Sequence, residues 1–165
     1  GVELSELALE SFAQENRLEM MEGRSGAFRT WTLDQLQLLG GDFFALDSLS
    51  AEDPKAGGDN AVQFDAIYDR AALIALPPEM RTRYAAYLGQ LLKPGGQILL
   101  ITLEYDQSQK AGPPFSVPTA ELEQLFAGQF VIERLESIDG LEDNSRFKAA
   151  GITWMPETAY RLVRR

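Results

Sequence analysis

The stretch "FDAIYDRAALIALPPEMRTRY", from Phe64 to Tyr84, decides the fold. Its first apolar run, Ala66 to Tyr68, stops at Asp69 and Arg70, and a second apolar run then ends in two prolines. This order is typical of a buried strand that hands the chain to a helix at the ligand edge of an α/β sheet. It leaves one question, which is why an acid and an arginine stand side by side at this turn.

The segment that follows the prolines predicts a helix. Pro78 suits the first helical turn, and the apolar residues keep helical spacing at Met80, Tyr84, Tyr87, Leu88 and Leu91. The "KPGG" that comes next ends the helix. The run "QILLITLEY" then shows no alternation of polar and apolar residues, which indicates a strand covered on both faces.

The rest of the chain continues to alternate between strands and helices. Ser5 can cap a helix that has Leu4, Ala8 and Phe12 on one face, and a polar, glycine-rich insertion at residues 48–60 predicts a surface loop. Helices are expected at 5–16 and 118–128, and strands at 27–39 (two, around a turn), 64–68, 130–138 and 158–165. The predicted fold class is α/β, with a mostly parallel sheet and an antiparallel strand near the C-terminus.

Length and charge narrow the function classes. The 165 residues predict a single domain spanning 1–165, and the formal net charge of −10 argues against a nucleic-acid binder. No apolar run approaches the roughly 20 residues that cross a bilayer, and the N-terminus has no signal-peptide pattern. We therefore expect no nucleic-acid partner and no membrane span.

Two absent residue types limit the possible chemistry. The chain has no Cys and no His, which removes disulfides, thiolate nucleophiles, serine triads and zinc sites built from imidazole or thiolate. We expect no metal and a cytoplasmic location. Any acid–base group must then be Asp, Glu, Tyr, Lys or Arg, or the reaction needs little proton transfer.

The residues that follow each predicted strand are the candidates for ligand binding, because ligands of such sheets bind at the C-terminal ends of the strands. Glu3 is placed to accept from ribose hydroxyls, or is a solvated loop acid. Asp42 follows two glycines and could accept from an exocyclic amine, or could simply form a turn. Phe43 could stack on a base or fill the core. Arg70 is either a fixed cation at the ligand edge or the structural partner of Asp69 or of another acid.

Five strings together resemble the thiopurine S-methyltransferase family in its bacterial form. They are "GVELSELA", "GDFFAL", "FDAIYDRAALIALPPEMRTRY", "LLKPGGQILLITLEYDQ" and "GPPFSVP". The resemblance covers the whole chain. It implies a class I, Rossmann-like methyltransferase fold that binds S-adenosyl-L-methionine.

The resemblance also implies roles for individual residues. Carried over by position, Glu3 would bind the ribose hydroxyls of the cofactor, Asp42 and Phe43 would hold its adenine, and Arg70 would lie beside the methyl donor and the acceptor. Arg146, in "DNSRFKAAGI", matches a family arginine near the acceptor. Three residues match a loop over the acceptor pocket: Pro113, Pro114 and Phe115.

The implied reaction is methyl transfer to the sulfur of thiopurines and other aromatic or heterocyclic thiols, with selenium and tellurium compounds as further acceptors. Such a thiol can arrive ionised, so the enzyme mainly aligns the reacting atoms. Arg70 and Arg146 would stabilise the incoming anion in place of a general base, which agrees with the absence of His.

The chain departs from the family at its N-terminus. Family members carry a preceding segment that includes a "PLCGKS"-like loop and the first, central strand, so the sequence predicts an N-terminally truncated chain. Two other interpretations stay open. One is a related small-molecule methyltransferase with a different acceptor. The other is a non-catalytic α/β fragment that binds a nucleotide or a partner protein.

Overall fold

The computed structural model describes residues 1–52, 62–142 and 144–165. They form two compact units, Gly1–Val62 and Gln63–Arg165. The predicted surface loop at 48–60 lies mostly outside the described residues. Its first residues belong instead to a 3-10 helix, η1 (Phe43–Glu52).

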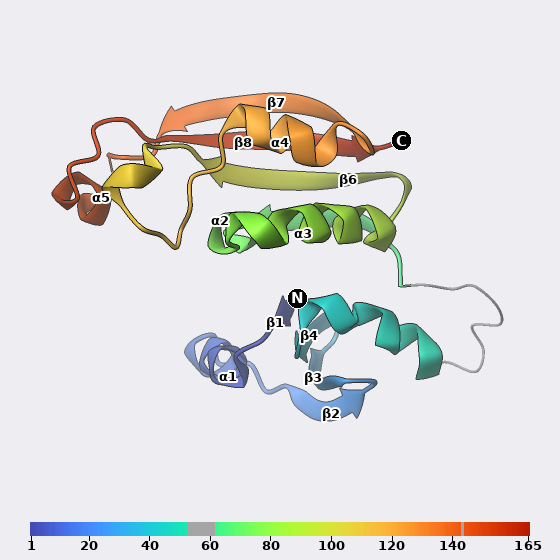
Figure 1. Cartoon of the computed structure of the whole chain (residues 1–165). Helices are drawn as coiled ribbons and strands as arrows, with labels where there is room; N and C mark the ends of the chain where they lie inside the picture. The colour runs from blue at the N-terminus through green and yellow to red at the C-terminus, as the bar shows by residue number, and fades with distance from the viewer. Residues whose placement is uncertain (53–61, 143) are drawn as a thin grey trace. The chain divides into compact units, whose positions relative to one another are not determined.

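The first unit is built on a four-stranded sheet with the order β1-β4-β3-β2 (Figure 1). Only β1 and β4 run parallel, and the other two pairings are antiparallel. The strand pair predicted at 27–39 is confirmed, and β2 is an additional strand. The elements are β1 (Val2–Glu3), α1 (Glu6–Glu15), β2 (Met21–Ser25), β3 (Phe28–Leu33) and β4 (Leu36–Gly40).

Helix α1 begins as predicted, because the Ser5 hydroxyl accepts a hydrogen bond from the Ala8 amide at 3.3 Å. The face that the sequence indicated is wrong, however. Leu4 is 75% exposed and Phe12 is 41% exposed, whereas Leu9 is buried against Trp31 and Leu38. Leu9 is the one buried residue of this helix and therefore docks it on the sheet.

The second unit contains a sheet with the order β5-β6-β8-β7. Strands β5 and β6 run parallel, while β8 is antiparallel to both β6 and β7. The expected helices and C-terminal strands are present. The elements are β5 (Phe64–Arg70), α2 (Ala72–Ala75), α3 (Pro78–Leu91), β6 (Leu92–Leu103), η2 (Gln107–Gln109), α4 (Thr119–Phe126), β7 (Phe130–Asp139), α5 (Ser145–Ala149) and β8 (Pro156–Arg164).

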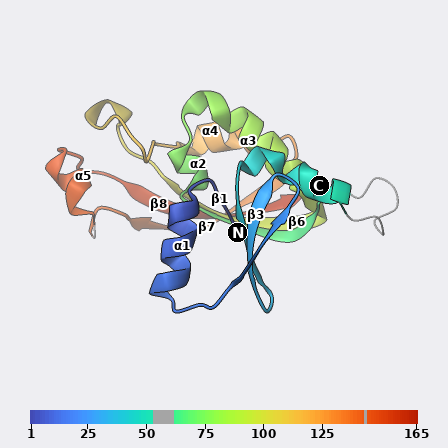
Figure 2. The ribbon, with the colours of Figure 1, turned by 90° about the horizontal axis from the view of Figure 1, so that it is seen from below.

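The helices α2, α3 and α4 all lie on one face of this sheet (Figures 1 and 2). Ile98 and Leu100 of β6 point to that face and are buried, whereas Leu99 between them is 42% exposed. The prediction that this strand is covered on both faces is therefore wrong within the described residues. An apolar run without alternation identified the strand but not the number of covered faces.

The α/β class is confirmed, but the sheet is not mostly parallel. The described strands make two parallel and four antiparallel pairings. The reason in the first unit is the short turns between β2, β3 and β4, since parallel neighbours need a long crossover. Asp34 and Gly26 make these turns possible with φ values of 50° and 54°.

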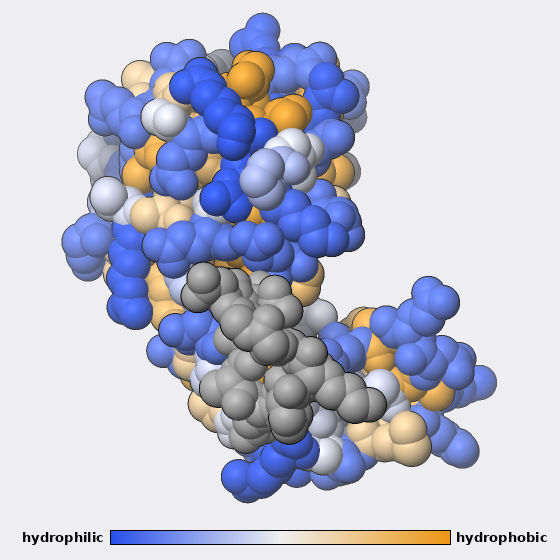
Figure 3. Space-filling model, turned by 90° about the vertical axis from the view of Figure 1, so that its right-hand side faces the viewer, coloured by the Kyte–Doolittle hydropathy of each residue, from blue (hydrophilic) through white to orange (hydrophobic). Residues whose placement is uncertain are grey.

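The surface agrees with the composition of the chain. On the face that Figure 3 shows, hydrophilic residues predominate and the hydrophobic patches between them are separate. No helix in the described part of the chain is long and apolar enough to span a bilayer.

Candidate functional site

The first unit brings Glu3 and Asp42 to the C-terminal ends of its two parallel strands. Glu3 ends β1 and stands opposite Gly40 at the end of the parallel strand β4. The Gly41 amide then donates to the Glu3 carbonyl at 3.0 Å, so the turn that carries Asp42 is fixed beside Glu3. Within this unit the two acids therefore lie at the C-terminal ends of neighbouring parallel strands.

Each of these acids uses one carboxylate oxygen to shape its own turn. Glu3 Oε1 accepts from the Ser5 amide at 2.8 Å, and Asp42 Oδ1 accepts from the Phe44 amide at 2.9 Å. Both residues are exposed. Each carboxylate therefore keeps a second oxygen that its turn does not use.

The two glycines before Asp42 are required by close packing rather than by an unusual φ. A Cβ on Gly40 would lie 2.8 Å from the Trp31 ring, and one on Gly41 would lie 2.8 Å from the Phe28 ring. The end of β4 thus packs directly on the aromatic rings of β3, which leaves no space for a side chain at Gly40 or Gly41. Phe43 is half-buried and meets Phe44 edge to face, with the ring centroids 5.7 Å apart.

In the second unit, Asp69 and Arg70 do not form the structural pair that one interpretation of the sequence proposed. The buried Asp69 carboxylate accepts from the Tyr84 hydroxyl at 2.9 Å and from the amides of Ala72 and Leu73 at 3.1 and 3.3 Å. It therefore caps the start of α2 and ties that start to α3. Burial raises the pKa of Asp69, and the hydrogen bonds from Tyr84 and the two amides oppose this rise.

Arg70 ends β5 and is exposed. The turn after it places Ala71 at a φ of 81°, a left-handed conformation that is uncommon for a residue with a side chain. Within the described residues, no acidic side chain lies within ion-pairing distance of Arg70. The arrangement supports Arg70 as an exposed cation at the strand end, with Asp69 acting on the backbone beneath it.

The loop that holds Pro113, Pro114 and Phe115 is fixed at the same end of the sheet as Arg70. The Phe115 amide donates to the Ile74 carbonyl of α2 at 2.6 Å, and the Val117 amide donates to the Leu103 carbonyl of β6 at 2.8 Å. Pro113 is exposed, while Pro114 and Phe115 are half-buried. The predicted loop is thus anchored to the helix that follows Arg70.

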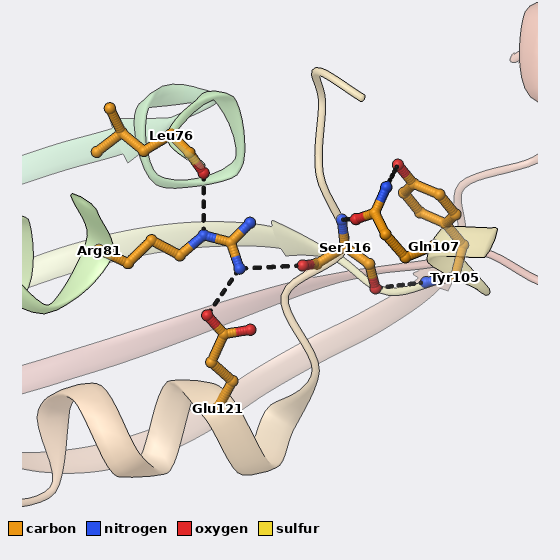
Figure 4. A network of polar contacts seen from close by, with 6 residues as sticks. All are labelled: Leu76, Arg81, Tyr105, Gln107, Ser116 and Glu121. Carbon is orange, nitrogen blue, oxygen red and sulfur yellow. Dashed lines mark hydrogen bonds and ion pairs between the residues drawn. The ribbon is translucent and has the colours of Figure 1, made fainter. Parts of the chain in front are cut away.

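Residues of the segment that follows β6 also form hydrogen bonds to this loop (Figure 4). The Tyr105 hydroxyl donates to the Pro114 carbonyl at 2.6 Å, and the Tyr105 amide donates to Ser116 Oγ at 3.0 Å. Gln107 Oε1 accepts from the Ser116 amide at 2.7 Å. The segment after β6 therefore determines where the loop lies.

Arg146 lies on the short helix α5 and is exposed. Its neighbour Phe147 is buried and packs edge to face on Tyr105, with the ring centroids 5.4 Å apart. Tyr105 thus contacts both α5 and the loop that carries Pro114. The sequence indicated Arg146 but not the aromatic contact that positions its helix.

Arg81 was missed by sequence analysis, although it is among the largest fully buried side chains described. Its Nε donates to the Leu76 carbonyl at 3.0 Å, and its Nη1 donates to the Ser116 carbonyl at 3.2 Å and to Glu121 at 2.7 Å (Figure 4). The signal was its spacing, since Arg81 falls on the same helical stripe as Tyr84 and Leu88.

Comparison with known proteins identifies the family. The sequence profile of the family described as thiopurine S-methyltransferase matches residues 1–165. A thiopurine S-methyltransferase of Pseudomonas fluorescens (strain SBW25) is 47% identical over all of this chain and 71% of the relative. Another of strain Pf0-1 is 45% identical over 98% of this chain and 70% of the relative, and one of Pseudomonas entomophila is 44% identical over 99% and 71%. The chain belongs to the thiopurine S-methyltransferase family.

Proposed function

We propose that the chain is a methyltransferase that transfers a methyl group from S-adenosyl-L-methionine to the sulfur of thiopurines and other aromatic or heterocyclic thiols. The observation that carries this proposal is the family match over residues 1–165, at 43–47% identity to relatives that are named for this activity. The match includes both compact units. We propose on the same ground that they are parts of one methyltransferase domain.

Glu3 and Asp42 fit the nucleoside part of this cofactor. Glu3 ends β1 and Asp42 follows the neighbouring parallel strand β4, and each has one carboxylate oxygen held by a backbone amide and a second oxygen that the turn does not use. Carboxylate oxygens suit ribose hydroxyls and the exocyclic amine of adenine, both of which are donors. We assign the ribose to Glu3 and the adenine to Asp42 and Phe43. The bound cofactor would supply a sulfonium methyl group.

Arg70 and Arg146 suit an anionic acceptor. Both guanidinium groups are exposed, and the anchored loop of Pro113, Pro114 and Phe115 lies next to the helix that follows Arg70. We propose that Arg70 contacts both the methyl donor and the acceptor and that Arg146 contacts the acceptor. The two cations would hold the ionised sulfur in place, so that the chain's residues need to move no proton.

An arginine pair and an apolar loop would also suit selenium and tellurium compounds, which form polarisable anions like thiolates. A related methyltransferase with an oxygen acceptor is the second candidate. No geometric observation favours it, because the same arginines would hold either anion.

Calorimetry with S-adenosylhomocysteine tests the cofactor assignment directly. We expect binding to this chain, and a loss of about tenfold or more in affinity for Glu3→Gln or Asp42→Asn, since each removes a charged hydrogen-bond acceptor. Glu133→Gln, on the exposed Arg161–Glu133 ion pair, is the matched control and should bind as the wild type does. The Pseudomonas fluorescens relative serves as the positive control. Binding by the relative but not by this chain would refute the proposal for this chain.

An acceptor panel tests the reaction. We expect labelled methyl groups to reach thiopurines and aromatic thiols at pH values where the thiol is ionised. Transfer to oxygen acceptors but not to thiols would contradict the sulfur assignment. Transfer to selenols would extend it.

A further inference from the structure

A buried arginine lies beneath the loop that carries Phe115. Arg81 is 1% exposed, and its guanidinium group contacts three different parts of the second unit (Figure 4). It donates to the Leu76 carbonyl beyond α2, to the Ser116 carbonyl in the loop, and to the Glu121 carboxylate on α4. A buried cation is costly unless it is paired and hydrogen-bonded, so this set of contacts demands an explanation.

One guanidinium nitrogen is left over. Nη2 of Arg81 is buried and has no hydrogen-bond partner within the described residues. The guanidinium carbon lies 5.9 Å from the centroid of the Phe115 ring, a distance at which the face of the ring attracts a cation. The aromatic side chain therefore offsets part of the cost of the missing hydrogen bond.

The two loop contacts are complementary. Arg81 binds the backbone of the loop through the Ser116 carbonyl and faces its aromatic side chain at Phe115. Backbone amides of the loop also donate hydrogen bonds to the carbonyls of Ile74 and Leu103, but these hydrogen bonds fix only the loop's backbone. In the described part of the chain, only Arg81 brings a charged group against the Phe115 ring.

We propose that Arg81, held by Glu121, is a positioning residue that sets the place of the Phe115 ring and thereby the fit of the acceptor. The inference rests on the proposed function, because it takes the Pro113–Phe115 loop as the cover of the acceptor pocket. Arg81 itself touches neither the acceptor nor the cofactor. It acts through the ring and the Ser116 carbonyl, and larger aromatic acceptors depend on it more than small ones.

The geometry requires arginine rather than any cation. Its planar fork donates to two carbonyls and a carboxylate at once and still presents a flat face to an aromatic ring. Lysine can replace the charge opposite Glu121 but not the simultaneous bonds to Leu76 and Ser116. Arg81→Lys is therefore the informative conservative variant, and Arg81→Met removes the charge at similar volume.

Two measurements on the full chain test the proposal together. The first is hydrogen exchange of the amides of Phe115, Ser116 and Val117. We expect exchange about tenfold faster in Arg81→Met and an intermediate rate in Arg81→Lys, since a charged hydrogen bond is lost. The second is steady-state kinetics. We expect the KM for a bicyclic thiopurine to rise about tenfold, the KM for a small thiol to rise less, and cofactor affinity to change less than about twofold.

Glu133→Gln is the control, because it removes an exposed ion pair of the same sheet. It should leave both the exchange rates and the constants at wild-type values. Wild-type exchange in Arg81→Met would overturn the proposal, as would equal losses for all acceptors and for the cofactor, which indicate a general loss of structure. If the wild type transfers no methyl group, the proposed function fails, and the exchange rates still decide whether Arg81 holds the loop.

Discussion

Two arginines of the second unit, Arg70 at the end of β5 and Arg81 in α3, show opposite uses of the same side chain. Arg70 is exposed and precedes a turn whose amides bind the Asp69 carboxylate. Arg81 is 1% exposed and binds two backbone carbonyls and the Glu121 carboxylate. Arg70 is exposed at the end of its strand and can therefore contact a ligand. The hydrogen bonds of Arg81 are instead used to hold the fold and the loop of Ser116.

The difference teaches that an arginine in an apolar context is not by itself a functional signal. Arg70 interrupts an apolar stretch of sequence and Arg81 falls on the buried stripe of α3, so an unpaired guanidinium would be costly to bury at either position. What separates them is the set of neighbours. Asp69, adjacent in sequence to Arg70, bonds to Tyr84 and to the start of α2 instead of to Arg70.

The largest expected effect on stability separates the two arginines directly. Arg81→Met should lower the free energy of unfolding by about 3 kcal/mol, the low end for breaking a buried ion pair, because the partly exposed Glu121 can turn to water. Arg70→Met should change it by less than about 0.5 kcal/mol. Urea unfolding of both variants measures this. Equal losses would mean that Arg70 is structural as well.

A smaller effect tests the support beneath Arg70. Tyr84→Phe removes the hydroxyl that donates to the buried Asp69 carboxylate, and should cost about 1–3 kcal/mol because that acceptor loses its side-chain donor. The same urea titration measures it. An unchanged midpoint would show that the amides of Ala72 and Leu73 alone satisfy Asp69.

The pH dependence of stability gives a further, smaller test of this support. Burial raises the pKa of Asp69 above its ordinary value of 3.8, so the folded chain binds a proton more readily than the unfolded chain. Asp69 therefore contributes least above its folded pKa and gains as the pH falls from there toward 3.8. The stability difference between wild type and Asp69→Asn should shift in favour of the wild type over that interval. A difference that does not change with pH would contradict the raised pKa.

The smallest effect belongs to an exposed ion pair. Glu133→Gln breaks the contact with Arg161, in which both side chains are 50% exposed, and should change the free energy of unfolding by less than about 0.5 kcal/mol. A loss of unfolding free energy comparable to that of Arg81→Met would show that burial does not explain the different effects of the two ion pairs.

Much of the fold could be predicted because local signals were strong. Ser5 and Pro78 marked helix starts correctly, and the strand that ends at Arg70 was evident from its apolar run. The covered faces could not be predicted in the same way. Whether Leu99 is buried depends on which helices pack on the sheet, and the sequence of β6 does not encode that.

The residues of the candidate site likewise include some that the sequence could predict and some that it could not. Glu3 and Arg70 end strands and Asp42 follows one, so their place at the C-terminal ends of the strands could be predicted from position alone. Arg81 and Tyr105 act through contacts with residues far along the chain, such as Ser116 and Phe147. No local pattern reports such contacts, although the place of Arg81 on an apolar helical stripe was a usable sign.

The most direct test of the central claim is the kinetics of Arg70→Met. If Arg70 contacts the reacting groups, turnover with a thiopurine should fall about a hundredfold or more, as when a group that stabilises transition-state charge is removed. The affinity for S-adenosylhomocysteine, measured by calorimetry, should fall far less. Equal losses in turnover and cofactor affinity would contradict the claim that Arg70 is the cation of the reaction.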